Sequence, residues 1–335
     1  MRTLRTAEKP RILQHEIPAF RGPSFSPSAQ LLAAIVQGIR DGELEEDDVN
    51  ASSTKSRNGA TELPDLGSPL GPPAGTPTPQ LFLSAAARSV AGPRPDNQDS
   101  GLTSATLLAV ADGVGGHVGG ATASALVVRS LADGRLTRVD GDPTVALERM
   151  VAAANQRMGD VCAEMPGLTG MATTLTAAVL SGDGRLGIAH IGDSRAYLLR
   201  RGRLVTLTRD HSVVQAMIDA GSLTADQAWT HPWRAVLLAA LHGRDDDLAA
   251  VEFAAFRVVP GDRLLLCSDG LWGPLPEEPI RAGLVTAADP TSAARMLADA
   301  AVAARATDNV TVIVADVCDR MTMTAISVVG AAAAI

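Results

Sequence analysis

The apolar and polar positions divide the chain near residue 80. Before that point the apolar residues keep no sustained period, and residues 50–79 are rich in Pro, Gly, Ser and Thr, as flexible linkers are. Within this part, residues 30–40 have apolar positions at helical spacing, which predicts a short amphipathic helix. We therefore expect a flexible, disordered arm over residues 1–79 that contains this short helix.

From residue 80 onward the pattern is that of a folded domain. Continuous or alternating apolar runs predict strands, whereas apolar residues three and four positions apart predict helices. The predicted strands cover residues 80–90, 105–112, 263–269 and 309–317, and the predicted helices cover 121–134, 143–165, 211–221 and 290–306. Short extended runs within 173–208, separated by turns that contain Gly, predict a β-meander.

This order of elements predicts an α+β fold with mainly antiparallel sheet. Grouped strands with helices inserted in pairs differ from the regular strand and helix alternation of a parallel sheet. We place the folded domain at residues 80–317 and treat residues 318–335 as a short C-terminal tail.

Composition and charge narrow the functional classes. Of the 335 residues 46% are hydrophobic and 3% are aromatic, so the core has to be built mainly from aliphatic side chains. A formal charge of -8 argues against nucleic acid or an anionic membrane as the main partner. Lys9 and Lys55 are the only lysines, so the folded part lacks a lysine for a Schiff base, a nucleotide-binding P-loop or a kinase active site.

The cysteines and the chain ends bear on location. Cys162, Cys267 and Cys318 are far apart and have no CxxC or other metal-binding spacing, which favours a reducing compartment. Cys267 lies inside an apolar run and is expected to be a small buried core residue. The first residues lack the pattern of a secretory signal, and the apolar C-terminal stretch is too short to span a bilayer. We expect a soluble, cytoplasmic protein.

Aspartates at the borders of apolar runs are the main candidates for chemistry. Asp112 and Asp269 each end a continuous apolar run and precede a glycine, and Asp99, Asp193 and Asp308 stand at similar borders. One Asp-Gly pair alone is usually only a turn. Several such acids brought together would repel one another unless a cation neutralised them. Oxygen ligands without a His or Cys set suit Mg²⁺ or Mn²⁺, and two such ions roughly 3.5–4 Å apart can activate water for phosphoester hydrolysis.

A series of motifs then carries a family resemblance. In chain order they read "RPDNQD", "VADGVGGH", "GMATT", "HIGDSRAYL", "RDHS", "HPWR", "LLLCSDGL" and "ATDNVTVI". This series lies within residues 80–317 and resembles bacterial members of the metal-dependent protein phosphatase family, the protein phosphatase 2C-like serine/threonine phosphatases. The resemblance implies a four-layer α-β-β-α sandwich of two antiparallel sheets, with two Mn²⁺ or Mg²⁺ ions bound in a cleft at one end.

The resemblance also implies a set of oxygen ligands. Asp112 matches the acid that bridges both ions, and the Gly113 carbonyl matches a further ligand. Asp269 and Asp308 match the other direct ligands. Asp99 matches an acid that binds metal directly or through water, and Asp193 matches the ligand of a third, weaker metal in bacterial members.

Three more positions receive roles by resemblance. Arg94 matches an arginine that grips the substrate phosphate, for which a forked guanidinium is suited; the alternative is an ordinary surface arginine. His117 matches a candidate general acid for the leaving serine or threonine oxygen, and the alternative is a hydrogen-bonded loop histidine. Asn309 is expected to orient Asp308.

The remaining histidines are not assigned to metal. His190 lies in an apolar run and is expected to be a hydrogen-bonded core residue. His211 and His231 match structural family positions at the two ends of a flap segment. His242 is not expected to be a metal ligand either. The chain departs from the family at two places. Gln98 stands where many eukaryotic members have glutamate, and "HPWRAVLLAALHG" lacks a Thr-Arg pair, which leaves flap contacts and substrate preference open.

The sequence therefore predicts hydrolysis of phosphoserine or phosphothreonine in proteins by water that two metal ions activate. Expected partners are phosphorylated proteins, with a serine/threonine kinase and its substrates as candidates, and the chain is expected to act as a monomer. Two alternatives stay open: a phosphatase-like binding or sensor module without turnover, and a nucleotide-binding enzyme that uses the Gly113–Gly119 loop. Retention of the metal aspartates argues against the first, and an acid directly before the glycine loop argues against the second.

Overall fold

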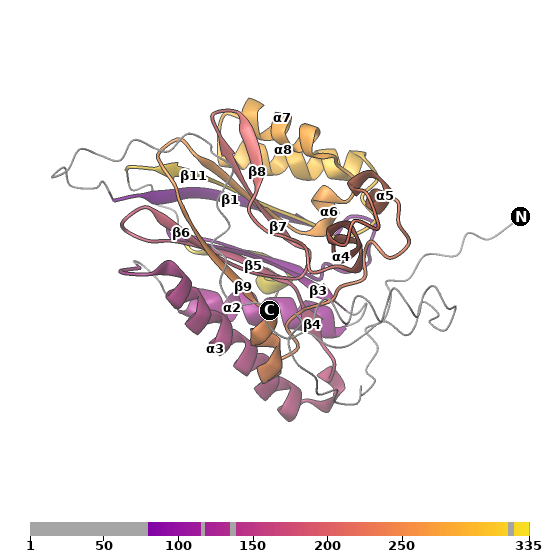
Figure 1. The fold of residues 1–335 in the computed structure, drawn as a ribbon. Helices are drawn as coiled ribbons and strands as arrows, with labels where there is room; N and C mark the ends of the chain where they lie inside the picture. Colours follow the sequence, from indigo (N-terminus) through magenta and orange to yellow (C-terminus); the bar gives the residue numbers. More distant parts are fainter. Residues whose placement is uncertain (1–79, 115–117, 135–138, 321–324, 335) are drawn as a thin grey trace, which may run out of the picture.

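The structure is a computed structural model that describes residues 80–114, 118–134, 139–320 and 325–334. Figure 1 shows four layers, in which two sheets lie face to face and each sheet is covered by helices on its outer side. This is the α-β-β-α sandwich that the family resemblance implies, and the α+β fold predicted from the sequence pattern is confirmed. The predicted arm over 1–79, with its helix at 30–40, lies outside the described residues.

The first sheet has five antiparallel strands. In spatial order they are β1 (Phe82–Val90), β11 (Val310–Cys318), β10 (Arg263–Cys267), β7 (Arg195–Arg200) and β8 (Arg203–Thr206). The second sheet has the order β12 (Ser327–Gly330), β2 (Asp99–Thr103), β3 (Leu107–Val114), β5 (Leu175–Leu180), β6 (Arg185–Ile191) and β9 (Glu252–Arg257), with the short β4 (Ala172–Thr173) paired to β3.

Long helices cover the outer faces of both sheets. Helices α2 (Val118–Asp133) and α3 (Pro143–Glu164) pack on the second sheet, and α7 (Glu277–Thr286) and α8 (Pro290–Ala303) cover the first (Figure 1). Helices α3 and α8 both begin with proline behind an aspartate cap. Asp142 accepts from the main-chain N–H of Thr144, and Asp289 accepts from that of Ser292, because these amides have no partner within the helix.

Several shorter elements complete the fold. Helices α4 (Val213–Asp219), α5 (Ala225–Trp229) and α6 (Asp269–Trp272) lie toward one end of the sandwich in Figure 1, and α9 (Ala331–Ala334) follows β12. Two short 3₁₀ helices, η1 (Pro166–Leu168) and η2 (Asp245–Ala250), stand in the connections. Within the described residues, no helix is both long and apolar enough to cross a membrane.

Aliphatic side chains fill three buried layers. The layer between the sheets contains Leu108 and Val110 of β3, which pack with Leu266 of β10 and other buried residues. Leu147 and Val151 of α3 belong to the layer under the second sheet, and Leu297 of α8 belongs to the layer over the first. Because β3 and β10 are buried on both faces, each reads as an unbroken apolar run in the sequence.

The predicted β-meander over 173–208 is wrong as a single sheet. Strands β5 and β6 form a hairpin in the second sheet, whereas β7 and β8 form a hairpin in the first. The chain crosses between the sheets at residues 192–194, where Gly192 has a φ of +104° that side-chain-bearing residues rarely adopt. A meander and two separate hairpins have the same local pattern, so the sequence does not tell them apart.

Residues beyond the expected domain boundary at 317 also take part in the second sheet. Strand β12 lies in the segment that the sequence sets apart as a tail, and it pairs antiparallel with β2, with Ser327 opposite Thr103. Helix α9 packs on α2, where the Arg129 guanidinium donates to the carbonyl of Ala332. The second sheet therefore includes residues 327–330, whose four positions are too few to show a period.

Candidate metal centre

Strand pairing gathers the predicted metal aspartates at one end of the sandwich. Asp99 at the start of β2 lies opposite Asp112 on β3. Asp269 follows β10, and Asp308 precedes β11, the antiparallel neighbour of β10. Asp193 lies in the crossing from β6 to β7, and β7 begins beside the end of β10. All five acids therefore come from the same strand ends, although they are spread over 210 positions of the sequence.

The two sheets are joined at this end by a buried hydrogen bond. The Ser268 hydroxyl, which directly precedes Asp269, donates to Asp99 Oδ2 at 2.6 Å. The same hydroxyl oxygen accepts from the main-chain N–H of Thr311 at 3.0 Å. Ser268 and Asp99 are both 0% exposed. The contact fixes the Asp99 carboxylate of the second sheet against the strand ends of the first.

Asp112 is held through its main chain by neighbouring threonines. Its N–H donates to Thr174 Oγ1 at 3.0 Å, and its carbonyl accepts from the Thr174 N–H at 2.9 Å and from the Thr173 hydroxyl at 2.9 Å. The next residue must be glycine, because a Cβ on Gly113 would lie 2.2 Å from the carbonyl oxygen of Gly120. The family resemblance accounts for this glycine by its carbonyl, which is expected to bind metal. The close approach of the Gly120 backbone is a second reason for a glycine at this position.

Asp269 and Asp308 are brought together by a close approach of backbone. A Cβ on Gly270 would lie 1.9 Å from the carbonyl oxygen of Asn309, so the chain after Asp269 packs directly against the chain after Asp308. Asp308 Oδ1 accepts from the main-chain N–H of Asn309 at 2.8 Å, and Asp308 Oδ2 forms an ion pair with Arg94 Nη2 at 3.0 Å. This ion pair places the predicted phosphate-binding arginine at the acidic end of the sandwich.

The Asn309 side chain holds the loop that carries Arg94. Its amide nitrogen donates to the carbonyls of Ala91 and Asp96 at 2.8 and 2.9 Å, and its oxygen accepts from the Gln98 N–H at 2.8 Å. The expected contact with Asp308 is made instead by the main-chain N–H of Asn309. The side chain therefore fixes the backbone on both sides of Arg94 and the residue before Asp99.

The described histidines make hydrogen bonds with other parts of the chain. His190 is 2% exposed, shares a hydrogen bond between Nδ1 and the Thr176 hydroxyl, and contacts the Arg209 carbonyl through Nε2. Burial lowers its pKa well below the usual range, so it is neutral, and the prediction of a hydrogen-bonded core histidine is confirmed. The His211 ring lies 4.9 Å from that of His190. His117, the candidate general acid, lies outside the described residues.

Cys267 is completely buried in β10, as the sequence predicts. Burial raises the pKa of its thiol, which disfavours the reactive thiolate form. The three cysteines are free thiols.

The donor set fits a hard divalent cation. Asp99 and Asp112 are directly opposite on neighbouring strands, which puts their side chains on one face of the sheet, and both are nearly completely buried. Two carboxylates so placed repel unless a cation or a proton lies between them. In the described part of the chain, no three His, Cys, Asp or Glu side chains are arranged to hold a metal ion by themselves. Main-chain carbonyls and water would have to complete the shell, as is common for Mg²⁺.

Sequence reasoning missed the side chains that position the acids. Ser268, Thr173 and Thr174 lie next to or inside quoted motifs, but they were not given a role there. For Ser268 the signal is a small hydroxyl residue beside an acid at the end of an apolar run, whereas no residue next to Thr173 or Thr174 in the sequence indicates a contact with Asp112. Trp272 was missed as well; its indole N–H donates to the carbonyl of Asp193 at 3.0 Å.

We expect Ser268→Ala to destabilise the protein even without metal. The substitution removes one hydrogen bond to a buried carboxylate and the acceptor of a buried N–H, which costs about 1–3 kcal/mol of the free energy of unfolding. Urea denaturation in EDTA measures the loss. Ser222→Ala is the matched control, because the Ser222 hydroxyl is exposed and bonds only locally to the Met217 carbonyl. Equal stability of both variants would show that Ser268 does not join the sheets.

Comparisons with known proteins agree with this geometry. The family model described as Protein phosphatase 2C matches residues 91–303. The serine/threonine protein phosphatase PstP of Mycobacterium tuberculosis is 43% identical over 242 residues, which are 71% of this chain and 46% of the relative. The serine/threonine phosphatase stp of Listeria welshimeri is 37% identical over 179 residues, 51% of this chain and 68% of the relative.

Solved structures give the same result. The crystal structure of Mycobacterium tuberculosis PstP/Ppp matches with a TM-score of 0.67 and 41% identity, and covers 70% of this chain and 98% of that one. The catalytic domain of PstP in complex with two manganese ions matches with a TM-score of 0.66 and 40% identity, over 71% of this chain and 99% of that one.

The sandwich and the acids at one of its ends define a phosphatase-type domain. The chain belongs to the protein phosphatase 2C family. It spans about half the length of the first curated relative that it matches, with 46% of that relative covered.

Proposed function

We propose that the chain is a metal-dependent protein serine/threonine phosphatase. The observation that carries this proposal is the convergence of Asp99, Asp112, Asp193, Asp269 and Asp308 at one end of the sandwich, with Arg94 beside them. Relatives described as serine/threonine phosphatases, and a PstP structure with two manganese ions, support it.

The acids would hold two Mn²⁺ or Mg²⁺ ions. Asp112 and the Gly113 carbonyl would contribute from the second sheet, and Asp269 and Asp308 would contribute from the first. Asp99 would bind directly or through water, and Asp193 would serve a third ion. When bound, such ions supply positive charge that activates water and stabilises the charge developing on the phosphoryl group.

Arg94 would bind the phosphate of the substrate. Its guanidinium offers a planar set of donors that matches two phosphate oxygens. Asn309 fixes the surrounding loop, so the arginine starts from a restricted position. To bind phosphate, Arg94 has to share or leave its contact with Asp308. We propose His117 as the general acid that protonates the leaving serine or threonine oxygen.

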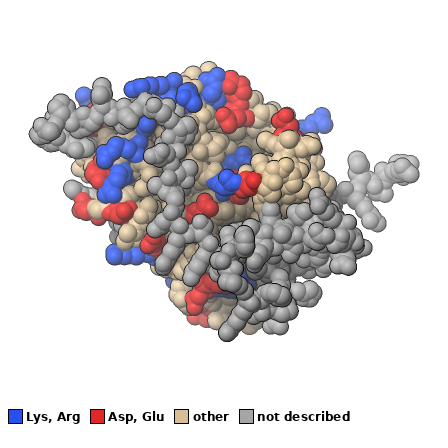
Figure 2. All heavy atoms as spheres, in the orientation of Figure 1, with Lys and Arg blue, Asp and Glu red and all other residues tan. Residues whose placement is uncertain are grey.

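The catalytic unit would extend from residue 80 to residue 334, with residues 1–79 as a separate arm. Phosphorylated proteins are the proposed substrates, and a serine/threonine kinase is a candidate among them. We propose that the chain acts as a monomer. We also place it in the cytoplasm, because its three free cysteines fit a reducing compartment. Both acidic and basic side chains occur on the described part of the face in Figure 2, and the formal charge of -8 favours a partner other than nucleic acid.

Hydrolysis assays test the proposal. The full chain is incubated with para-nitrophenyl phosphate and with a phosphothreonine peptide, in Mn²⁺ and in EDTA. We expect release of phosphate from both substrates in Mn²⁺ and none above background in EDTA. Turnover that persists in EDTA, or an inactive chain in Mn²⁺ and Mg²⁺, would contradict it; the inactive result would favour the binding or sensor module.

A further inference from the structure

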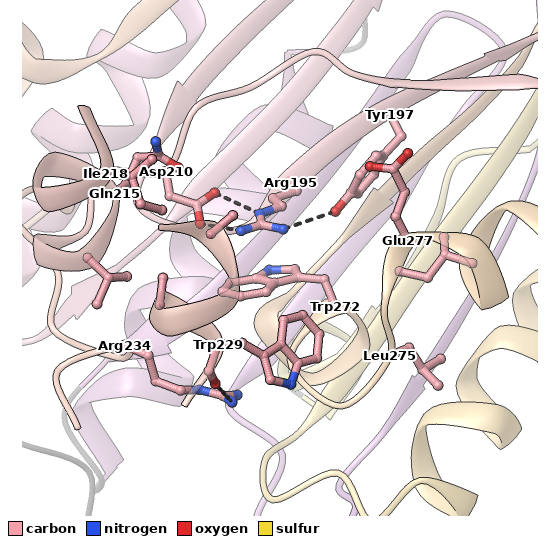
Figure 3. A pocket seen from close by; sticks show the side chains of 14 residues that line it. Arg195, Tyr197, Asp210, Gln215, Ile218, Trp229, Arg234, Trp272, Leu275 and Glu277 are labelled. Atoms are coloured by element: carbon pink, nitrogen blue, oxygen red, sulfur yellow. Dashed lines mark hydrogen bonds and ion pairs between the residues drawn. The ribbon is translucent and has the colours of Figure 1, made fainter. Parts of the chain in front are cut away.

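A pocket of about 250 Å³ lies between the connecting helices and the first sheet. Figure 3 shows its walls, which come from α4 and α5 on one side and from α6, α7 and the segment between them on the other. Its apolar lining includes Ile218, Trp229, Trp272, Leu275 and Ile280. The two indoles lie near the middle of this view. Large aromatic surfaces of this kind are typical of recognition sites for apolar groups.

The side of the pocket formed by β7 is rigid. The Arg195 guanidinium donates two hydrogen bonds to the Asp210 carboxylate, at 2.8 and 2.7 Å (Figure 3). It also donates to the Tyr197 hydroxyl at 3.4 Å. Its central carbon lies 3.7 Å from the ring centroid of Trp272. Burial alone would lower the pKa of Arg195, but the hydrogen bonds and charge of Asp210 outweigh it and raise the pKa. The guanidinium is thus a permanently charged, fully engaged part of the wall, and it fixes the Trp272 ring.

The pocket adjoins the acidic end of the sandwich. Trp272 is the last residue of α6, the helix that begins at Asp269, and its indole N–H donates to the carbonyl of Asp193. Arg195 lies two positions after Asp193 on the same stretch of chain. The pocket is therefore built on the two segments that carry Asp193 and Asp269.

Trp229 and Arg234 give the rim a distinct character. Trp229 at the end of α5 lines the pocket and is 38% exposed, so part of its indole is open to solvent at the rim. Arg234 Nη1 donates to the Trp229 carbonyl at 3.2 Å. Among the ion pairs of the described residues, none involves Arg234. The rim thus offers an apolar surface next to the Arg234 guanidinium, which can form an ion pair with an acidic residue of a partner.

We propose that this pocket binds one bulky apolar side chain of the phosphoprotein substrate, with an acidic residue of the substrate next to Arg234. The pocket is smaller than the roughly 300–1,000 Å³ of sites for small molecules, so one side chain fits it better than a cofactor. This inference rests on the proposed phosphatase function. It adds a determinant of substrate preference that is separate from the phosphate and the metal ions.

Phosphothreonine peptides test the proposal. A set of peptides carries either Leu or Ala at each of the three positions before and after the phosphothreonine, with all other positions constant. We expect Leu to raise kcat/KM about tenfold over Ala at one or two positions. In Trp229→Ala this ratio should fall to about one, whereas Met296→Ala, at a 42% exposed apolar residue of α8, should keep it. The ratio within each variant is unaffected by a uniform loss of activity.

A second variant tests the charged part of the rim. Placing Glu beside the favoured Leu should raise kcat/KM about two- to fivefold, and Arg234→Gln should remove this gain while the preference for Leu over Ala remains. A wild-type chain that hydrolyses all peptides equally, or a Trp229→Ala variant that keeps the ratio, would overturn the pocket while leaving the phosphatase function intact. A wild-type chain that hydrolyses neither these peptides nor para-nitrophenyl phosphate would overturn both.

Discussion

Replacing Asp269 with asparagine is expected to lower kcat/KM for a phosphothreonine peptide about a thousandfold at saturating Mn²⁺. Asp269 follows β10, and the chain after Asp269 packs against the chain after Asp308; we propose that its carboxylate binds a shared cation. Loss of the charge that the ions supply to the reaction is worth about 4 kcal/mol, which is about three powers of ten in rate. Initial rates of phosphate release measure the effect.

Asp299→Asn is the matched control for this variant. Asp299 is an exposed aspartate on α8, a helix that covers the outer face of the first sheet, and its neutralisation changes the total charge by the same amount. We expect wild-type rates for this control. If Asp269→Asn were as active as Asp299→Asn, the acids at the strand ends would not carry the reaction.

The second large expected effect is a loss of stability when the buried ion pair at the other end of β10 is broken. Arg200 Nε and Nη2 donate to the two carboxylate oxygens of Asp262 at 2.8 and 2.6 Å. Both residues are buried, with Arg200 7% exposed and Asp262 2% exposed. Asp262→Ala would leave a buried guanidinium without its carboxylate, which costs about 3–5 kcal/mol of the free energy of unfolding. The expected result is a clear shift of the urea midpoint to lower concentration.

An exposed ion pair provides the comparison for Asp262. Glu278→Ala removes the partner of Arg281 in α7, and we expect no measurable change because exposed pairs contribute little. In folded Asp262→Ala protein at low temperature, Mn²⁺ affinity should stay close to that of the wild type, because β10 separates Asp262 from Asp269. An unchanged urea midpoint would show that the ion pair of Arg200 and Asp262 does not contribute to the free energy of unfolding.

The sequence predicts the parts of the site that local pattern determines. Asp112 lies near the end of β3 and Asp269 follows β10, and both strands are buried on both faces, so an unbroken apolar run followed by an acid marks these two residues. Asp99 is harder to place, because the strand that it begins reads "DSGLT" and has no apolar period. Its assignment came from family resemblance, and its position opposite Asp112 is given by the structure.

Contacts between distant segments could not be predicted from the sequence. The hydrogen bond from Ser268 to Asp99 joins residues 169 positions apart, and neither residue's neighbours indicate the other. The crossing at Gly192 depends on which sheet each hairpin joins, a choice made by packing rather than by the turn itself. The pocket beside Trp272 likewise brings together residues 195–280, and only the assembled fold shows that they share one cavity.

Calorimetric titration with Mn²⁺ tests the central claim most directly, because it measures the metal centre without requiring a substrate. The acids are proposed to hold two ions, the number present in the PstP complex. For the wild type we predict about two tightly bound Mn²⁺ per chain, apart from the weaker third ion proposed at Asp193. For Asp112→Asn we predict an affinity of the tight sites at least about a hundredfold lower, with Asp299→Asn unchanged. Wild-type stoichiometry and affinity in Asp112→Asn would contradict the account.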